Sequence, residues 1–214
     1  MSDFSLILVD PKPDLGEAFR RRFEGLPRVE VVTGRFEDLP RFDCMVSAAN
    51  SFGLMDGGVD AAIIRFFGSE LMDRVQRHIL EHYRGEQPVG TSFVITTGHP
   101  KHPHVAHTPT MRVPMTIEHT DNVYLAMHAL LLAVHRHNQS GEPRIGTVAC
   151  PGLGTATGRV PPGEAAFQMA LAYRNFLDPP RALDWNVARK RQEEIHYGGD
   201  LGFQLPRTDR TRGG

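Results

Sequence analysis

The chain has 214 residues, and its 24 basic and 25 acidic side chains leave a formal net charge of -1. This length suits one ordinary domain with a short appendage, and the balanced charge argues against a broad surface for nucleic acid or anionic membrane. No apolar run approaches the roughly 20 residues that a bilayer span needs, and no basic leader precedes an apolar segment. We therefore expect a cytoplasmic protein with no membrane or nucleic-acid partner.

Short β-rich runs alternate with helical patterns along the chain. Apolar and β-branched residues predict strands over residues 6–9, 29–33, 44–48, 92–97, 105–107 and 145–149. A helical period covers residues 14–23, 60–67, 70–83, 122–137 and 164–176. This alternation predicts an α/β fold with a mostly parallel sheet and helices on both faces.

The composition changes after Pro179 and Pro180, where we place a domain edge near residue 180. Residues 1–180 form the predicted domain, and residues 181–214 form a C-terminal extension. We expect a short helix over residues 183–195 and disorder from residue 206. The helix is interpreted as a surface helix docked by Trp185 and Val187, and a partner-binding role is the alternative.

The most informative segment runs from residue 46 to residue 64. An apolar strand stops at Asn50, the glycine pair Gly57 and Gly58 follows, and Asp60 lies where a helical pattern begins. The free N–H groups and the positive dipole end of such a helix favour an anion. Two plainer interpretations stay open: Asn50 closes a turn, and Asp60 is an acidic residue favoured in any first helical turn.

A second glycine loop follows the predicted strand 145–149. Its glycines can take positive φ and let a ligand approach the backbone, and its threonines add hydroxyl donors. These residues are Gly152, Gly154, Thr155, Thr157 and Gly158. Both loops leave the carboxyl end of a strand, where open α/β sheets bind ligands. Neither loop has the spacing of a dinucleotide fingerprint or a P-loop.

The two cysteines and a group of histidines add no catalytic or metal site to the prediction. Cys44 and Cys150 adjoin apolar strands, which favours reduced core thiols, and no histidine stands at a recognised spacing to activate Cys150. Four histidines, at positions 99, 102, 104 and 107, are interpreted as a surface loop. We predict no metal and no cofactor.

Three segments together resemble the macrodomain family, which binds ADP-ribose and in some branches hydrolyses its derivatives. They are SAAN at residues 47–50 with GGVDAAI at residues 57–63, HTP at residues 107–109, and the loop 151–158. Their order and spacing cover residues 29–178. The resemblance implies a three-layer α/β/α sandwich with a mixed, mostly parallel sheet of about six strands. It also implies an ADP-ribose cleft at the edge of the sheet.

The resemblance also implies roles for individual residues. Asn50 would bind the distal ribose, and Asp60 would orient or deprotonate the water that hydrolyses an ADP-ribosyl ester or O-acyl-ADP-ribose. A nearby diphosphate would raise the pKa of Asp60. The expected ligand is ADP-ribose or an ADP-ribosylated protein. The alternative is a non-catalytic module that reads ADP-ribose, or another nucleotide derivative, on a partner. The expected ligand-binding residues are Arg35, Phe36, Ala49, Asn50, Gly57, Gly58, Val59, Asp60, Gly152, Leu153, Gly154, Thr155, Ala156, Thr157 and Gly158.

The chain departs from the family pattern at three places. Arg35 stands where many macrodomains have an aspartate that accepts a hydrogen bond from the adenine amino group, which a guanidinium cannot do. Glu37 or Asp38 could replace that acceptor, or Arg35 could stack on the base. The bulky loop 52–56, with its extra carboxylate, could narrow the pocket or repel anions. The segment 107–114 has a longer proline pattern than the family's usual turn, and Arg112 within it is a candidate phosphate contact. The oligomeric state is not predicted.

Overall fold

The computed structural model of this chain describes residues 4–195. Within this range, six strands form one sheet with the order β2-β1-β6-β3-β5-β4. The strands are β1 (Ser5–Asp10), β2 (Val29–Thr33), β3 (Cys44–Ser47), β4 (Phe93–Thr96), β5 (His104–His107) and β6 (Thr147–Cys150). All neighbouring pairs are parallel except β4 and β5, which are antiparallel. The prediction of a mixed, mostly parallel sheet is confirmed.

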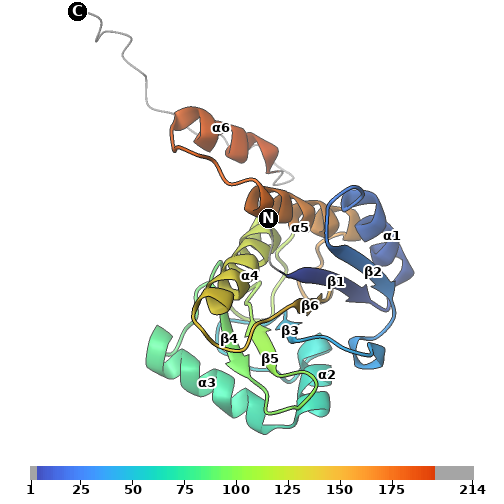
Figure 1. The fold of residues 1–214 in the computed structure, drawn as a ribbon, viewed down its shortest axis with the longest axis vertical. Coiled ribbons are helices and arrows are strands. Elements are labelled where there is room, and N and C mark those ends of the chain that lie inside the picture. The colour runs from blue at the N-terminus through green and yellow to red at the C-terminus, as the bar shows by residue number, and fades with distance from the viewer. Residues whose placement is uncertain (1–3, 196–214) are drawn as a thin grey trace, which may run out of the picture.

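Helices cover both faces of the sheet. They are α1 (Pro13–Arg22), α2 (Gly58–Phe67), α3 (Glu70–Tyr83), α4 (Asn122–Gln139), α5 (Pro162–Leu177) and α6 (Trp185–Glu194). Figure 1 shows α1, α4 and α5 on one side of the sheet and α2 and α3 on the other, which confirms the three-layer arrangement. A 3-10 turn, η1 (Phe36–Asp38), was not predicted. None of the helices described in residues 4–195 combines the length and the apolar character that a membrane span requires.

Two apolar cores lie against the two faces of the sheet, and strand β1 contributes to both. Leu6 and Leu8 pack with α1, α4 and α5, whereas Ile7 and Val9 pack with α2 and α3. Successive side chains of a strand point to opposite faces, so an unbroken apolar run is what a sheet covered on both faces requires. Burial of each such side chain contributes roughly 1.5–3 kcal/mol, and a register slip of one residue would exchange the two sets.

The parallel strands also determine where the functional loops meet. Strands β2, β1, β6, β3 and β5 run in the same direction and are neighbours in that order. Their carboxyl ends therefore lie along one edge of the sheet. The segments that follow them leave from this common edge, although they are far apart in sequence.

Helix α6 lies outside the three layers, beside α5 (Figure 1). Its first turn is capped by Asp184, whose carboxylate accepts a hydrogen bond from the Val187 N–H at 2.9 Å. Trp185 is 51% exposed, so the expected docking by Trp185 is wrong, whereas Val187 is partly buried. The division at residue 180 stays a prediction. The predicted disorder from residue 206 lies outside the described residues.

Candidate functional site

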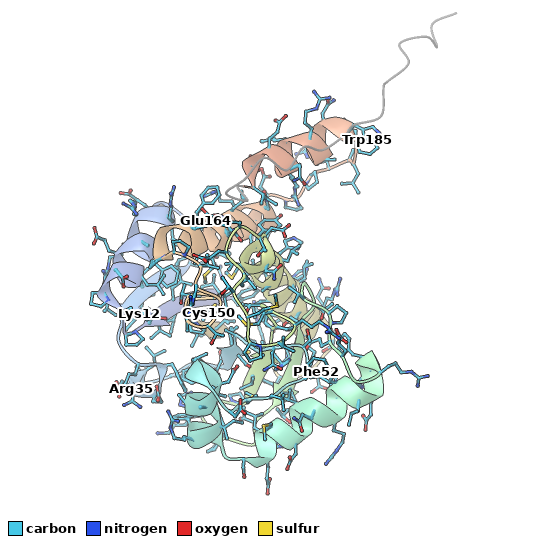
Figure 2. All side chains as sticks on the ribbon, turned by 180° about the vertical axis from the view of Figure 1, so that it is seen from behind. Lys12, Arg35, Phe52, Cys150, Glu164 and Trp185 are labelled. Carbon is cyan, nitrogen blue, oxygen red and sulfur yellow. The ribbon has the colours of Figure 1, made fainter. Side chains whose placement is uncertain are left out.

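The carboxyl edge of the sheet opens into a cleft of about 560 Å³. This volume lies in the range typical of small-molecule sites. Its walls come from the segments that follow the five parallel strands: residues 10–12, 34–37, 48–60, 110–114 and 151–158 contribute, and α2 adds two more side chains. Figure 2 shows Lys12 and Arg35 on the same side of the molecule. The fold thus brings together both glycine loops.

The predicted ligand-binding residues lie in the walls of this cleft, with one exception. Leu153 does not line the cleft, because its side chain is fully buried in the core formed with α1, α4 and α5. The loop turns this apolar side chain inward between two glycines that face the cleft. Ligand contact by the other residues stays a prediction.

The first glycine loop presents an uncapped helix N-terminus to the cleft. Gly57 is the N-cap of α2 and makes no side-chain hydrogen bond, and Gly58 has φ 56°. The first backbone hydrogen bond of the helix runs from the Ala61 N–H to the Gly57 carbonyl. The N–H groups of residues 58–60 therefore precede the intrahelical ladder and can bind an anion.

The second glycine loop requires glycine for two different reasons: one position takes a positive φ, and two others leave no room for a Cβ atom. Gly154 has φ 70°, a conformation that favours glycine, as expected. Gly152 and Gly158 do not have positive φ, which corrects the prediction for them. They leave no room for a side chain: a Cβ on Gly158 would lie 2.5 Å from the Gly154 carbonyl oxygen, and one on Gly152 would collide with Leu15.

Asp60 is a buried carboxylate in the wall of the cleft. It is 7% exposed, and its Oδ1 accepts a hydrogen bond from the Ser47 hydroxyl at 2.7 Å. Burial raises the pKa of Asp60 to about 6, the Ser47 hydrogen bond opposes this change, and the charge of Asp56 adds to it. These surroundings thus favour a carboxylate that exchanges a proton near neutral pH.

Asn50 closes its own loop. Its Oδ1 accepts hydrogen bonds from the N–H groups of Phe52 and Leu54, at 3.0 and 3.3 Å, and its Nδ2 donates to the Leu54 carbonyl at 2.7 Å. The turn-closing interpretation therefore describes Asn50, which also lines the cleft. The second N–H of its amide has no hydrogen-bond partner among residues 4–195 and can still reach a ligand.

The bulky loop narrows the cleft less than expected. Leu54, which is 49% exposed, and Asp56 line the cleft. Met55 is buried in the core beside α2 and α3, and the Phe52 ring lies against Arg112. Only two of these bulky side chains therefore face the space where a ligand would lie.

Charges around the cleft are nearly balanced. The cations in its walls are Lys12, Arg35 and Arg65, and the acids are Asp10, Glu37, Asp56 and Asp60. Arg35 forms an ion pair with Glu37 at 2.6 Å. Burial opposes ionisation of Glu37, but its hydrogen bond to Arg35 and the charges of Arg35 and Arg65 lower its pKa. An anionic ligand would thus depend on backbone N–H groups rather than on a surplus of cations.

Several residues of the cleft were not predicted. Asp10 is the last residue of β1 and Lys12 follows that strand, and the rule that strand ends meet at one edge would have found both once β1 was placed beside β6. Thr110, Met111 and Pro114 follow β5, and no motif marks them. Arg112, a candidate phosphate contact, does not line the cleft; it binds both carboxylate oxygens of Glu86 at 2.5 and 2.9 Å.

The histidine interpretation is wrong for three of the four residues. His102, His104 and His107 are at most 5% exposed, because β5 and the segment before it are buried. His102 stacks on Phe42 with ring centroids 3.9 Å apart. Among the described residues, no group of three or more potential ligands is placed to hold a metal ion.

Both cysteines are free and fully buried, as expected for reduced core thiols. Burial raises the pKa of the Cys44 and Cys150 thiols well above the ordinary value. The thiol is therefore the stable form of each side chain, which argues against a nucleophile in the cleft.

Comparison with known proteins gives a consistent result. The family model described as Macro domain matches residues 46–169. An uncharacterized protein of Aquifex aeolicus is 33% identical over 167 residues, which cover 78% of this chain and 92% of that protein. An uncharacterized protein of Thermotoga maritima is 30% identical over 71% of this chain, but the match spans only 24% of that longer protein.

Solved structures share the fold at low sequence identity. The Oceanobacillus iheyensis macrodomain with MES bound has a TM-score of 0.55 at 18% identity, covering 76% of this chain and 87% of that chain. A mutant of the same macrodomain with ADPR gives the same TM-score and identity, covering 76% and 88%. The macrodomain of Mycobacterium tuberculosis DarG has a TM-score of 0.52 at 21% identity, covering 63% and 82%.

Proposed function

This chain belongs to the macrodomain family, and we propose that it binds ADP-ribose, or a closely related nucleotide derivative, in the cleft at the carboxyl edge of its sheet. We propose further that it hydrolyses an ADP-ribosyl ester or an O-acyl-ADP-ribose ester. Free ADP-ribose and an ADP-ribosylated protein are the corresponding ligands.

The binding proposal rests on the two glycine loops. The uncapped N-terminus of α2 offers N–H groups to a diphosphate, and the tightly packed loop around Gly154 and Gly158 places its backbone in the wall of the cleft. The cleft has no surplus of cations, so these backbone donors are the main attraction for the two phosphate charges. The O. iheyensis mutant solved with ADPR shares this fold and supports the same class of ligand.

The hydrolysis proposal is carried by one observation, the buried carboxylate of Asp60 in the wall of the cleft. Burial raises its pKa to about 6, so it is ionised at pH 7 yet accepts a proton far more readily than an exposed carboxylate. Ser47 occupies Oδ1, and Oδ2 has no hydrogen-bond partner among the described residues. This second oxygen is the proposed contact for the attacking water.

The reaction can be written with its protons balanced. Asp60 takes a proton from water as the water oxygen bonds to the ester carbonyl carbon. The bond between that carbon and the ribose oxygen then breaks, and the ribose oxygen takes the proton held by Asp60. The products are ADP-ribose and a carboxylic acid, which releases its proton to solvent, and Asp60 returns to the carboxylate form.

Two measurements test this function. Calorimetric titration should detect ADP-ribose binding, and absence of binding at millimolar ligand would reject the proposal. Purified protein should release ADP-ribose from O-acetyl-ADP-ribose, and Asp60→Ala should abolish turnover while ADP-ribose still binds. Equal rates for the wild type and Asp60→Ala would reject the catalytic role.

A non-catalytic reader is the second candidate, favoured by the closed loop at Asn50. Both polar atoms of the Asn50 side chain hold the backbone of residues 52–54, so one N–H at most remains for a ligand. A reader would bind ADP-ribose with no turnover at any pH. We also propose a cytoplasmic location, since Cys44 and Cys150 are free thiols.

A further inference from the structure

Ser47 is the last residue of β3 and is completely buried beneath the cleft. Its hydroxyl makes one hydrogen bond to a charged group, the donation to Asp60 Oδ1. We propose that Ser47 is a positioning residue that holds one oxygen of Asp60 so that the other oxygen faces the reacting water. The role of Asp60 in this inference rests on the proposed function.

The sheet keeps Ser47 in place independently of the helix that carries Asp60. Strand β3 pairs with β5 in parallel, with Ser47 beside His107, and the Ser47 carbonyl accepts a hydrogen bond from the Thr108 N–H at 3.0 Å. Asp60 lies in the first turn of α2, which starts after the long loop that follows β3. The hydrogen bond between their side chains therefore joins this helix to a rigid strand end, close to where the ligand is proposed to bind.

Among residues 4–195, the Ser47 hydroxyl is the single hydrogen-bond donor to the carboxylate of Asp60. No other hydrogen bond to its carboxylate is present in this part of the chain, and Asp60 lines the cleft. A carboxylate held by one oxygen keeps a defined orientation, whereas one with no donor can rotate about its terminal bond. Ser47 thus decides which oxygen remains for chemistry.

A second acceptor lies beside Ser47. His107 Nδ1 is 2.6 Å from Gln87 Oε1, and Gln87 Nε2 donates to the His107 carbonyl at 3.4 Å, so Nδ1 carries the hydrogen. His107 Nε2 is then a lone-pair acceptor, and it is buried without a partner. Because His107 Nε2 has no hydrogen-bond partner among the described residues, it does not compete for the hydroxyl hydrogen of Ser47, which goes to Asp60.

The ionisable groups around this pair are few. Asp56 acts on Asp60 and favours its protonated form, and His78 acts on His107. Burial lowers the pKa of His107 to about 3, so this imidazole stays neutral over the range in which Asp60 titrates. A change in the titration of Asp60 after removal of the Ser47 hydroxyl is then assigned to the lost hydrogen bond.

The test compares Ser47→Ala with Ser47→Thr, which keeps the hydroxyl, and with the control Ser92→Ala. Ser92 is a partly buried serine whose hydroxyl pairs with Thr108 at 2.7 Å and not with Asp60. A carbon-13 titration by NMR follows the Asp60 carboxyl group directly, and a pH-rate profile follows hydrolysis of O-acetyl-ADP-ribose. The NMR titration needs no activity.

In Ser47→Ala, we expect the pKa of Asp60 to rise from about 6 to about 7. At pH 8.5, where Asp60 is ionised in every variant, kcat should still fall roughly tenfold with KM unchanged, because the carboxylate is no longer oriented. Ser47→Thr should restore both values at least in part, and Ser92→Ala should change neither.

An unchanged Asp60 titration in Ser47→Ala would overturn the inference, and so would wild-type kcat at pH 8.5. If Ser47→Ala does not fold, loss of the wild-type titration and rate profile in Ser47→Thr would overturn it as well, because that variant retains the hydroxyl. Absence of hydrolysis by the wild type would reject the proposed function instead, while the NMR titration would still report whether Ser47 holds Asp60.

Discussion

Replacing Asp60 with asparagine should stabilise the protein near neutral pH while abolishing turnover. Asparagine has nearly the same shape, and its side-chain oxygen can still accept the hydrogen bond from Ser47. The substitution removes only the buried negative charge. A group that is retained for chemistry at the expense of stability should respond in this way.

The size of the effect follows from the pKa of Asp60. A rise from the ordinary value of 3.8 to about 6 means that the folded state disfavours the ionised form by about 3 kcal/mol. Asp60→Asn removes the charge and so avoids this cost, but the amide group makes imperfect hydrogen bonds in its place. We therefore expect about 1–3 kcal/mol of stabilisation at pH 7.5. For a chain of this length, each kcal/mol corresponds to about 2–4 °C in Tm.

The direction in which the free energy of unfolding changes with pH distinguishes Asp60 from other titrating groups. Between pH 4 and 6 the folded state holds a proton on Asp60 that the unfolded state has released, so stability from this group falls as pH rises through about 6. His107 has the opposite sign: its pKa is lowered from 6.5 to about 3, so its contribution is present above pH 6.5 and is lost on acidification. Only the difference between Asp60→Asn and the wild type isolates Asp60.

Urea unfolding at pH 7.5 and pH 4.5 measures this difference. The advantage of Asp60→Asn should be clear at pH 7.5 and should shrink to about a third of that value at pH 4.5, where the carboxyl group of the folded wild type is protonated but that of the unfolded chain is still mostly ionised. The matched control is Asp178→Asn, an exposed position away from Asp60 where the stability change should stay within about 0.5 kcal/mol. A less stable Asp60→Asn at pH 7.5, or an advantage independent of pH, would refute the reasoning.

Three further results are expected. Gly158→Ala should destabilise the second glycine loop by about 1–3 kcal/mol and weaken ADP-ribose binding in calorimetry, because its Cβ would lie 2.5 Å from the Gly154 carbonyl oxygen; wild-type affinity would contradict this. ADP-ribose affinity should rise as pH falls from 7 to 5, since the ligand's charge favours protonated Asp60, and titrations showing a fall would refute it. Arg112→Ala should leave the affinity within about twofold, because Arg112 is paired with Glu86 outside the cleft; a tenfold loss would restore it as a phosphate contact.

The alternation of strand and helix patterns along the chain was sufficient to predict the three layers of the fold. Residues 6–9 are apolar without interruption, which is typical of a strand buried on both faces, and Leu8 and Val9 lie in opposite cores. Helix starts were less accurate: α2 begins at Gly58 rather than residue 60, because glycines give no apolar periodicity. The exposed Trp185 was missed since a tryptophan in a sequence does not reveal which surface it contacts.

The sequence by itself determined the two glycine loops and the spacing of Asn50 and Asp60, because close backbone approach and a free helix N-terminus are local properties of residue type and order. Only the tertiary structure decided what surrounds them. Ser47 donates a hydrogen bond to Asp60, and Arg112 forms an ion pair with Glu86. These contacts depend on which strands are neighbours and how deeply each side chain is buried, and both follow from packing over long sequence distances.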